Sequence, residues 1–234
     1  MAEGGKPGPF ASWAPGSYLG QLSDGARRTL LQAGTLRSYA AGDVLFREGD
    51  PSSYLLMIAE GLVKVSAAAP TGQETLLAIR GPGDVIGELS ALGRNPLRSA
   101  TVIAAGRVTA TILANHVFLQ LAETHPELAT AMIRVLSAKL REASVARVEV
   151  HTYGVRVRLA RVLLSLAASL GRRTEHGTVL ELPLTQPELA ALVSASPRSV
   201  ARALQEFRDG GLIDIGYRRV LLRDPEALTE AAHG

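Results

Sequence analysis

Two charged side chains, Glu88 and Arg98, are the residues of this chain best suited to hold a small molecule. Arg98 begins an apolar segment expected to form a strand, and its planar guanidinium can donate two parallel hydrogen bonds to a phosphate. Glu88 follows a glycine-rich turn and begins a short apolar run expected to form one helical turn. An ionised carboxylate only accepts hydrogen bonds, so it suits a sugar hydroxyl and repels a phosphate. The pair therefore predicts a pocket for a sugar joined to a phosphate.

The neighbours of the two charges fit the same ligand. The N–H groups at a helix start lack partners within the helix and suit an anionic oxygen. The simpler interpretation is that Glu88 and Arg98 form an ion pair across a turn and bind nothing. From the residues alone, both interpretations stay open.

Short apolar stretches alternate with glycine-bearing turns from about residue 37 to residue 113, and this spacing predicts an antiparallel roll or barrel. Some proteins of this shape are metal-dependent enzymes that need two or three histidines on neighbouring strands. Here the first histidine is His116, and all five histidines follow the strand region without ligand spacing. We expect no metal site and no reaction centre, and hence no enzyme.

Composition restricts the remaining classes. The 234 residues contain no cysteine, which excludes a disulfide and an iron–sulfur cluster held by thiolates. No apolar run is long enough to cross a bilayer and no secretory leader is evident, so we expect a cytoplasmic protein without a membrane partner. The net charge of +3 permits a nucleic-acid partner without demonstrating one.

A long helix is predicted from residue 126 to about residue 150, with two apolar stripes. Two stripes favour two partners, namely the roll and the same helix of a second subunit in a two-fold dimer. Both stripes could instead face one intramolecular core. The first stripe consists of Ala129, Ile133, Leu136, Leu140 and Ala143, and the second of Leu128, Met132 and Val135.

The carboxy-terminal part reads as a winged helix-turn-helix. Residues 151–154 are expected to form a hinge, followed by an amphipathic helix over 155–170 with Arg156, Arg158 and Arg161 largely outward. Two short helices then flank a tight turn at 194–195, and residues 212–222 predict a two-stranded wing. An arginine pair on a helix is usually only a solvated face, but here it lies on the second helix of the motif, where side chains reach base edges. The predicted DNA contacts are Thr185, Ser196, Arg198, Ser199, Arg202, Gln205, Arg218 and Arg219.

The segment Val85-Ile86-Gly87-Glu88-Leu89, a short spacer and Arg98-Ser99-Ala100 resembles the phosphate-binding cassette of cyclic-nucleotide-binding domains. With the long helix and the wing, residues 18–225 are similar to the cyclic-AMP receptor protein and FNR superfamily of transcription regulators. The resemblance implies an α+β fold with an antiparallel β-roll, a dimerisation helix and a winged helix-turn-helix. It implies the ligand contacts Gly87, Glu88, Leu89, Arg98, Ser99 and, through the purine, Ser144.

The chain departs from this family at two places. Ala143-Ser144 stands where the family has Thr-Ser beside the purine, so the choice between cyclic AMP and cyclic GMP is open. The second helix of the motif reads Pro197-Arg198-Ser199-Val200, with an arginine where the family has an acidic reader of cytosine. Operator specificity therefore cannot be carried over.

We expect four segments: a flexible tail (1–16), a cyclic-nucleotide-binding roll (17–125), a dimerisation helix and hinge (126–153) and a DNA-binding domain (154–234). The expected partners are double-stranded DNA, a second copy of the chain and RNA polymerase, with a cyclic nucleotide as effector. Two alternatives are a regulator of the same build that binds DNA without nucleotide, and a β-roll enzyme or nucleotide-sensing module whose heads bind protein.

Overall fold

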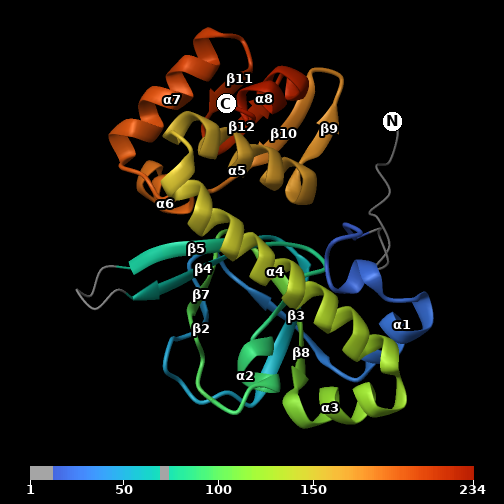
Figure 1. Ribbon diagram of the computed structural model, residues 1–234. Coiled ribbons are helices and arrows are strands. Elements are labelled where there is room, and N and C mark those ends of the chain that lie inside the picture. The colour runs from blue at the N-terminus through green and yellow to red at the C-terminus, as the bar shows by residue number, and fades with distance from the viewer. Residues whose placement is uncertain (1–12, 69–73) are drawn as a thin grey trace.

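The computed structural model describes residues 13–68 and 74–234, which form two lobes connected by one long helix (Figure 1). Residues 1–12 of the predicted tail, and residues 69–73 within the predicted strand region, lie outside the described residues. Of residues 13–16, assigned to the tail from their composition, Trp13 and Ala14 are partly buried, and the Arg27 guanidinium lies 5.0 Å from the centre of the Trp13 ring. The Ser17 hydroxyl also donates to the Ala14 carbonyl at 2.7 Å.

The amino-terminal lobe, called the roll, is built from two four-stranded antiparallel sheets. One has the strand order β1-β8-β3-β6 and the other β2-β7-β4-β5, so strands distant in sequence pair within each sheet. A mainly aliphatic core fills the space between them, as expected for a chain with few aromatic residues. The strands are β1 (Thr35–Tyr39), β2 (Val44–Phe46), β3 (Tyr54–Glu60), β4 (Val63–Ala68), β5 (Glu74–Arg80), β6 (Val85–Ile86), β7 (Thr101–Ala104) and β8 (Val108–Ala114).

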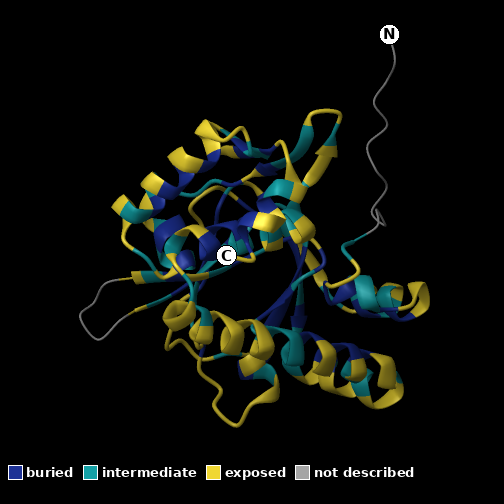
Figure 2. Ribbon diagram, turned by 45° about the horizontal axis from the view of Figure 1, so that its top comes forward, coloured by how far each residue is buried: buried dark blue, intermediate teal, exposed yellow. Residues whose placement is uncertain are grey.

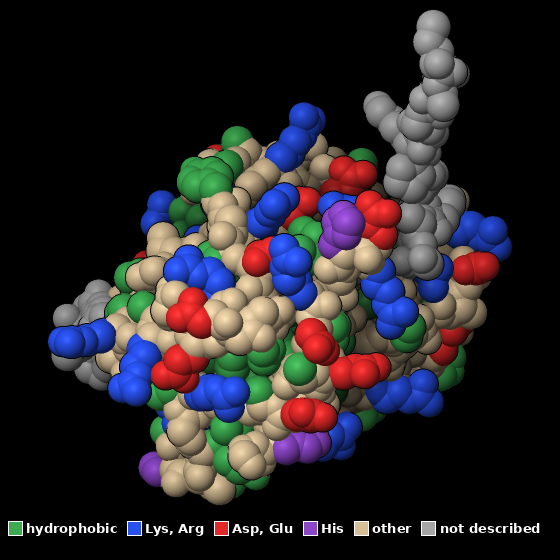
Figure 3. All heavy atoms as spheres, turned by 90° about the horizontal axis from the view of Figure 1, so that it is seen from above, with side chains coloured by type: hydrophobic (Ala, Val, Ile, Leu, Met, Phe, Trp, Pro, Cys, Tyr) green, Lys and Arg blue, Asp and Glu red, His purple; other side chains and the backbone are tan. Residues whose placement is uncertain are grey.

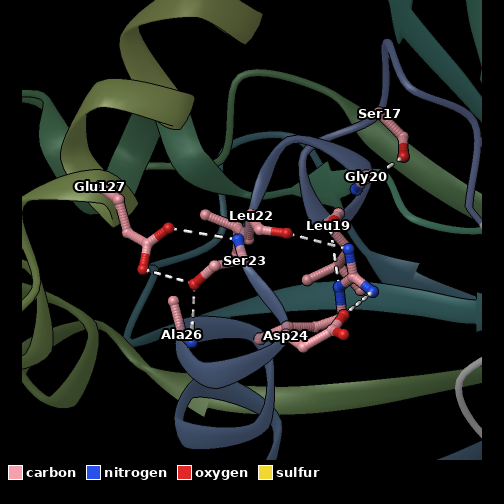
Figure 4. Close-up of polar contacts among 9 residues, drawn as sticks. Ser17, Leu19, Gly20, Leu22, Ser23, Asp24, Ala26 and Glu127 are labelled. Atoms are coloured by element: carbon pink, nitrogen blue, oxygen red, sulfur yellow. Dashed lines mark hydrogen bonds and ion pairs between the residues drawn. The ribbon is translucent and has the colours of Figure 1, made fainter.

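Helices pack against strands β3, β6 and β8 of the roll. They are η1 (Leu19–Gln21), α1 (Asp24–Gln32), α2 (Glu88–Leu92) and α3 (Asn115–Thr124). Ser23 caps α1, because its hydroxyl oxygen accepts from the Ala26 amide. The Glu127 carboxylate in turn accepts from the Ser23 hydroxyl at 2.7 Å and from the Ser23 amide at 3.2 Å (Figure 4). This contact attaches the start of the long helix to the start of α1.

The long helix α4 (Pro126–Thr152) extends from the roll toward the second lobe (Figure 1). The stripe of Leu128, Met132 and Val135 is buried against the roll, as predicted. Ile133 and Leu140 of the other stripe are 64% and 70% exposed. The two stripes therefore do not share one intramolecular core.

The carboxy-terminal lobe, called the head, has its own core (Figure 2). Its sheet has the order β11-β12-β10-β9 and all neighbours are antiparallel. The helices and the wing occur where the sequence predicts them, whereas β9 and α8 were not predicted. The elements are α5 (Val155–Leu170), β9 (Arg172–Thr174), β10 (Gly177–Glu181), α6 (Gln186–Val193), α7 (Pro197–Asp209), β11 (Ile213–Gly216), β12 (Arg219–Leu222) and α8 (Pro225–Ala231).

Arg158 was expected to point outward, and the structure shows that this prediction is wrong. Its side chain is buried and donates to four backbone carbonyls at 2.8–3.2 Å. Two of these belong to Val150 and Tyr153 at the end of α4, and two to Val193 and Ser194 at the end of α6. The last carbonyls of a helix have no partner within it, so a cation placed there satisfies them.

The roll and the head touch directly as well as through α4. The Lys64 ammonium on β4 lies 2.6 Å from the Glu188 carboxylate on α6, and Arg218 in the wing donates to the Ala105 carbonyl at 3.2 Å. Ile79 on β5 packs into the core of the head. The head is thus held to the roll by an ion pair, a hydrogen bond and an apolar contact.

Candidate functional site

The cassette, residues 87–99, begins at a glycine that no other residue could replace without displacing its neighbours. Gly87 joins β6 to α2 with φ of 84°, a backbone conformation that favours glycine. A Cβ atom there would lie 2.4 Å from Nη1 of Arg98 and 3.1 Å from the Phe46 ring. The glycine therefore allows the arginine to approach the backbone at the start of α2.

Glu88 is buried, and its partner is a residue that the sequence analysis missed. Its Oε1 atom lies 2.9 Å from Nζ of Lys139 on α4, which also donates to the Val85 carbonyl at 3.3 Å. Lys139 is the next member of the buried stripe that includes Met132 and Val135. The sequence signal that could have identified Lys139 is a basic residue at the next position of an otherwise apolar helical stripe. This pair connects the cassette directly to α4.

Arg98 is buried without an ionic partner: within residues 13–68 and 74–234, no carboxylate oxygen lies within 4.0 Å of its nitrogens. Its Nη2 donates to the Tyr54 carbonyl at 2.7 Å and its Nη1 to the Ser90 hydroxyl at 3.3 Å. The interpretation that Glu88 and Arg98 neutralise each other is therefore wrong. A guanidinium has five N–H donors, so three are not used by these two bonds.

The surroundings of Arg98 shift its pKa. Burial lowers the pKa of the guanidinium from its ordinary value, while Tyr54, Asp50 and Glu88 act in the opposite direction. The backbone of Arg98 is fixed from both sides, because its amide donates to the Asp50 carbonyl and its carbonyl accepts from the Gly49 amide, each at 2.9 Å. The turn before β3 thus positions the arginine.

The structure brings only some of the predicted ligand residues together. Gly87, Glu88 and Arg98 lie at one end of the roll, where Gly87 approaches the Arg98 side chain. Leu89 is 55% exposed, and Ser99 is exposed next to Arg98 in the chain. Ser144 is exposed on α4, and its hydroxyl donates to the Leu140 carbonyl at 2.9 Å. Their role in ligand binding remains a prediction.

Two cavities differ in their position relative to the predicted ligand residues: one lies beside Arg98 and the other lies away from the cassette. One of about 150 Å³ lies beside Arg98 on the side of Phe46, and its lining also includes Asp50 and Tyr54 but not Gly87 or Glu88. The other, of about 1490 Å³, lies between the roll and the head and shares no residue with the cassette. Among the residues that the structure describes, no three histidine or acidic side chains gather to hold a metal.

The helix-turn-helix is formed by α6 and α7. Thr185 and Glu188 form a reciprocal capping box at the start of α6, as their spacing predicts. Helix α6 ends and the turn begins at Ser194, whose φ of 53° is left-handed in a position where glycine is usual. The Ser196 hydroxyl caps α7 by accepting from the Ser199 amide at 3.1 Å.

The outer face of α7 carries three of the predicted DNA contacts, Arg198, Arg202 and Gln205, and all three are exposed. Arg202 pairs with Glu206 one turn later at 3.1 Å, and Gln205 donates to Asp209 at 2.6 Å. Basic and acidic side chains alternate on the surface seen from above rather than forming one basic patch (Figure 3).

The predicted wing residues differ in their surroundings. Arg218, at the turn between β11 and β12, has φ of 55° and donates to the roll through the Ala105 carbonyl. Arg219 begins β12 and is exposed. Both arginines are therefore exposed in this arrangement, but Arg218 is also bonded to the roll.

Comparison with known proteins gives one consistent result. Residues 36–125 match the family model for the cyclic nucleotide-binding domain, and residues 157–231 match that for the Crp-like helix-turn-helix domain. The chain is 34% identical over 196 residues to the CRP-like cAMP-activated global transcriptional regulator of Mycobacterium tuberculosis, covering 83% of this chain and 86% of that protein. It is 31% identical over 198 residues to the cyclic AMP receptor protein of Thermus thermophilus, covering 85% and 88%.

Solved structures agree with the sequence matches. FixK2 from Bradyrhizobium japonicum superposes with a TM-score of 0.74 at 20% identity, covering 85% of this chain and 96% of that one, which concerns the fold alone. A CRP/FNR-family transcriptional regulator from Thermus thermophilus gives a TM-score of 0.69 at 29% identity, covering 86% and 99%. The predicted α+β fold is confirmed. With both domains matched over most of its length, the chain belongs to the CRP/FNR superfamily, as a DNA-binding transcription regulator with a cyclic nucleotide-binding domain and not an enzyme.

Proposed function

We propose that the protein is a homodimeric transcription regulator whose DNA binding is controlled by a cyclic nucleotide bound in the roll. Cyclic AMP is the first candidate, because two relatives at least 31% identical are named for it, and cyclic GMP is the second. In this proposal Arg98 and Ser99 hold the cyclic phosphate, Gly87 and Glu88 contact the ribose region, and Leu89 and Ser144 complete the pocket.

The observation that carries the proposal is the state of Arg98. A buried guanidinium that lacks a carboxylate partner among the described residues keeps its full charge for an incoming anion. Its unused N–H donors can form a bidentate contact with a phosphate. A side chain with only a structural role would have its donors satisfied by the protein.

Lys139 supplies a route from the ligand to α4. A ribose hydroxyl that donates to Glu88 would share the carboxylate with the Lys139 ammonium, which now lies 2.9 Å away. Binding would therefore change the contacts of α4 at the cassette. Ligand control requires that the nucleotide favours one arrangement, and a change from mostly off to mostly on needs roughly 5 kcal/mol of differential affinity.

The exposed stripe of α4 supports the dimer. Ile133 and Leu140 are large apolar side chains on one face of a helix whose other face is buried on the roll. A second copy of the same helix would cover them in a two-fold arrangement. Replacing Leu140 by glutamate should convert a dimer to a monomer in analytical ultracentrifugation, whereas Leu119→Glu on α3, which is also exposed, should leave the dimer intact.

The DNA contacts are proposed from the exposed face of α7. Arg198 and Arg202 would pair with guanine in the major groove, with help from Ser199 and Gln205. The remaining proposed contacts are to phosphates and come from Thr185, Ser196, Arg218 and Arg219. Arg218 would first have to leave the Ala105 carbonyl. RNA polymerase as a further partner remains a prediction.

One experiment tests the central proposal. Calorimetric titration with cyclic AMP and cyclic GMP should identify one ligand that binds one site per chain. A gel shift on DNA selected from a random pool should then show tighter binding in its presence. A shift that is unaffected by either nucleotide would contradict ligand control, and the absence of any shift would contradict DNA binding.

Two observations favour a second candidate, a regulator of the same build that binds DNA without nucleotide. The Glu88 carboxylate already has a cationic partner in Lys139, and Ala143 lacks the hydroxyl that this family places next to the purine. The same gel shift distinguishes the candidates, because only the second predicts equal affinity with and without nucleotide.

Over residues 13–68 and 74–234, no helix has both the length and the apolar character needed to span a bilayer.

A further inference from the structure

The Arg98 guanidinium lies over an aromatic ring. Its Cζ atom is 3.5 Å from the centre of the Phe46 ring and 4.8 Å from the centre of the Tyr54 ring. The two rings are themselves 5.5 Å apart and tilted by 51°. Phe46 ends β2 and is 5% exposed, and Tyr54 begins β3. These two strands therefore bring two of the few aromatic residues of the chain to the same guanidinium.

A buried cation needs compensation, and an aromatic ring provides it differently from a carboxylate. A carboxylate would neutralise the positive charge of the guanidinium and accept hydrogen bonds from two N–H donors on one of its edges. A ring attracts the cation through its negative face and occupies no donor. Stacking on Phe46 therefore stabilises the buried Arg98 side chain while leaving its charge and its remaining donors available.

The Phe46 ring also restricts the orientation of the Arg98 guanidinium. Phe46 covers one face of the guanidinium, and the backbone of Gly87 limits the approach from another side, since a Cβ atom at Gly87 would touch both Nη1 of Arg98 and the ring. The Tyr54 carbonyl holds Nη2 at 2.7 Å. Together these contacts restrict the orientation of the donors that remain.

We infer that Phe46 is the positioning residue for phosphate recognition: its ring, with Tyr54 behind it, holds the Arg98 fork charged and oriented toward the cyclic phosphate. The inference rests on the proposed function, because it assigns Phe46 a role in the same pocket. It concerns the phosphate alone, so it predicts no loss of contacts to the nucleoside part of the ligand.

Calorimetry with cyclic AMP and with adenosine, which lacks the phosphate, tests the inference on the full-length protein. Phe46→Leu removes the ring and should weaken cyclic AMP binding by about tenfold to thirtyfold, the value of a desolvated cation–π contact, while adenosine binding stays unchanged. Phe46→Tyr keeps the ring and should bind cyclic AMP within a factor of about two of the unmodified protein. Phe46→Met is a second ringless variant in case the leucine variant folds poorly.

Phe118→Leu is the matched control, because Phe118 is also buried but packs against Tyr18 and helices on the other side of the roll. It should leave the affinity for cyclic AMP unchanged. An equal loss in this control, or an equal loss for adenosine and cyclic AMP in Phe46→Leu, would mean that the ring only supports packing, and either result would overturn the inference.

Failure of the inference can be told apart from failure of the proposed function. If the unmodified protein binds a cyclic nucleotide and Phe46→Leu and Phe46→Met bind it equally well, only the role of Phe46 is rejected. If the unmodified protein binds neither cyclic AMP nor cyclic GMP, the proposed function fails and the role of Phe46 falls with it.

Discussion

Arg98 in the roll and Arg158 in the head are the two buried arginines of the described structure, with 4% and 9% of their surface exposed. In residues 13–68 and 74–234 neither has a carboxylate within 4.0 Å. Arg158 donates to four backbone carbonyls, whereas Arg98 donates to one carbonyl and one hydroxyl and stacks on a ring.

The comparison teaches that burial and the lack of an acidic partner do not by themselves identify a ligand site. The number of donors already used separates the two cases. Arg158 is largely saturated by helix ends and so is expected to stabilise the head. Arg98 keeps donors and charge, and so is expected to bind an anion.

The largest effect that would sharpen this contrast is expected at Arg158. Arg158→Ala removes the donor of four carbonyls, one in a buried hydrogen bond and three in partly buried ones, and a buried unsatisfied group costs about 1–3 kcal/mol. We expect the head to lose about 3 kcal/mol of unfolding free energy, measured by hydrogen exchange of the α5 and α6 amides. Arg98→Ala should lower the free energy of unfolding by about 1 kcal/mol, because it leaves a single carbonyl, that of Tyr54, without its donor. Equal losses for the two variants would remove the distinction.

The second effect concerns ligand affinity. Arg98→Lys keeps the charge but loses the fork, and two charge-assisted hydrogen bonds are worth about 3 kcal/mol together. Calorimetry should show roughly a hundredfold loss of affinity for the cyclic nucleotide. Arg94→Lys, in the exposed loop of the cassette, should bind normally. An unchanged affinity in Arg98→Lys would reject the bidentate contact.

The third effect concerns an exposed arginine, Arg202, which should contribute to DNA binding and little to the stability of the fold. Arg202→Ala breaks an exposed pair with Glu206 and should change stability by less than about 1 kcal/mol. It should weaken binding to the selected operator by roughly 1–3 kcal/mol in a gel shift and relax the preference at one base pair. A uniform loss on all sequences would make Arg202 a phosphate contact. Arg173→Ala, exposed on β9 and outside the proposed DNA contacts, is the control and should bind the operator normally.

The smallest effect is expected in the pH dependence of stability and involves Glu188, a carboxylate that, unlike the two buried arginines, has a partner of opposite charge. Although burial raises the pKa of Glu188, hydrogen bonds from Lys64 and Thr185 hold it below its ordinary value of 4.5. The unfolded chain then binds this proton more tightly, so the contribution of Glu188 to stability is present above pH 4.5 and is lost as the pH falls through the folded pKa.

Thermal unfolding between pH 7 and pH 3 should therefore show a slightly smaller loss of stability on acidification for Lys64→Ala than for the unmodified protein. Glu188→Gln should show the same reduction, and Glu226→Gln, exposed at the start of α8, should not. A steeper loss in Lys64→Ala would contradict the assigned sign.

Much of the fold could be predicted from the sequence, because local rules decide it. The turn glycines, the capping box at Thr185 and Glu188 and the cap at Ser196 each act within a few residues. The buried stripe of α4 followed from helical periodicity. The family resemblance then supplied the antiparallel β-roll as the architecture, whereas the order of the strands came only from the structure.

The parts that were missed depend on contacts between distant segments. Arg158 was misplaced because its acceptors lie on α4 and at the end of α6, up to 36 residues away. Lys139 and Phe46 were missed because only the folded roll brings α4 and β2 next to the cassette. Residue type and spacing identified the charges of the pocket, whereas their partners required the tertiary structure.

The contacts of Arg158 have a consequence for how movement could reach the DNA. Its bonds to the Val150 and Tyr153 carbonyls, together with the ion pair between Arg161 and Glu149, cross the junction between α4 and α5. The final turn of α4 is thus bonded to α5 across Gly154. If α4 tilts at Lys139, these bonds would carry the tilt into the head, and the distance from Lys139 to α7 would turn a small angle into a larger translation at the DNA-facing helix.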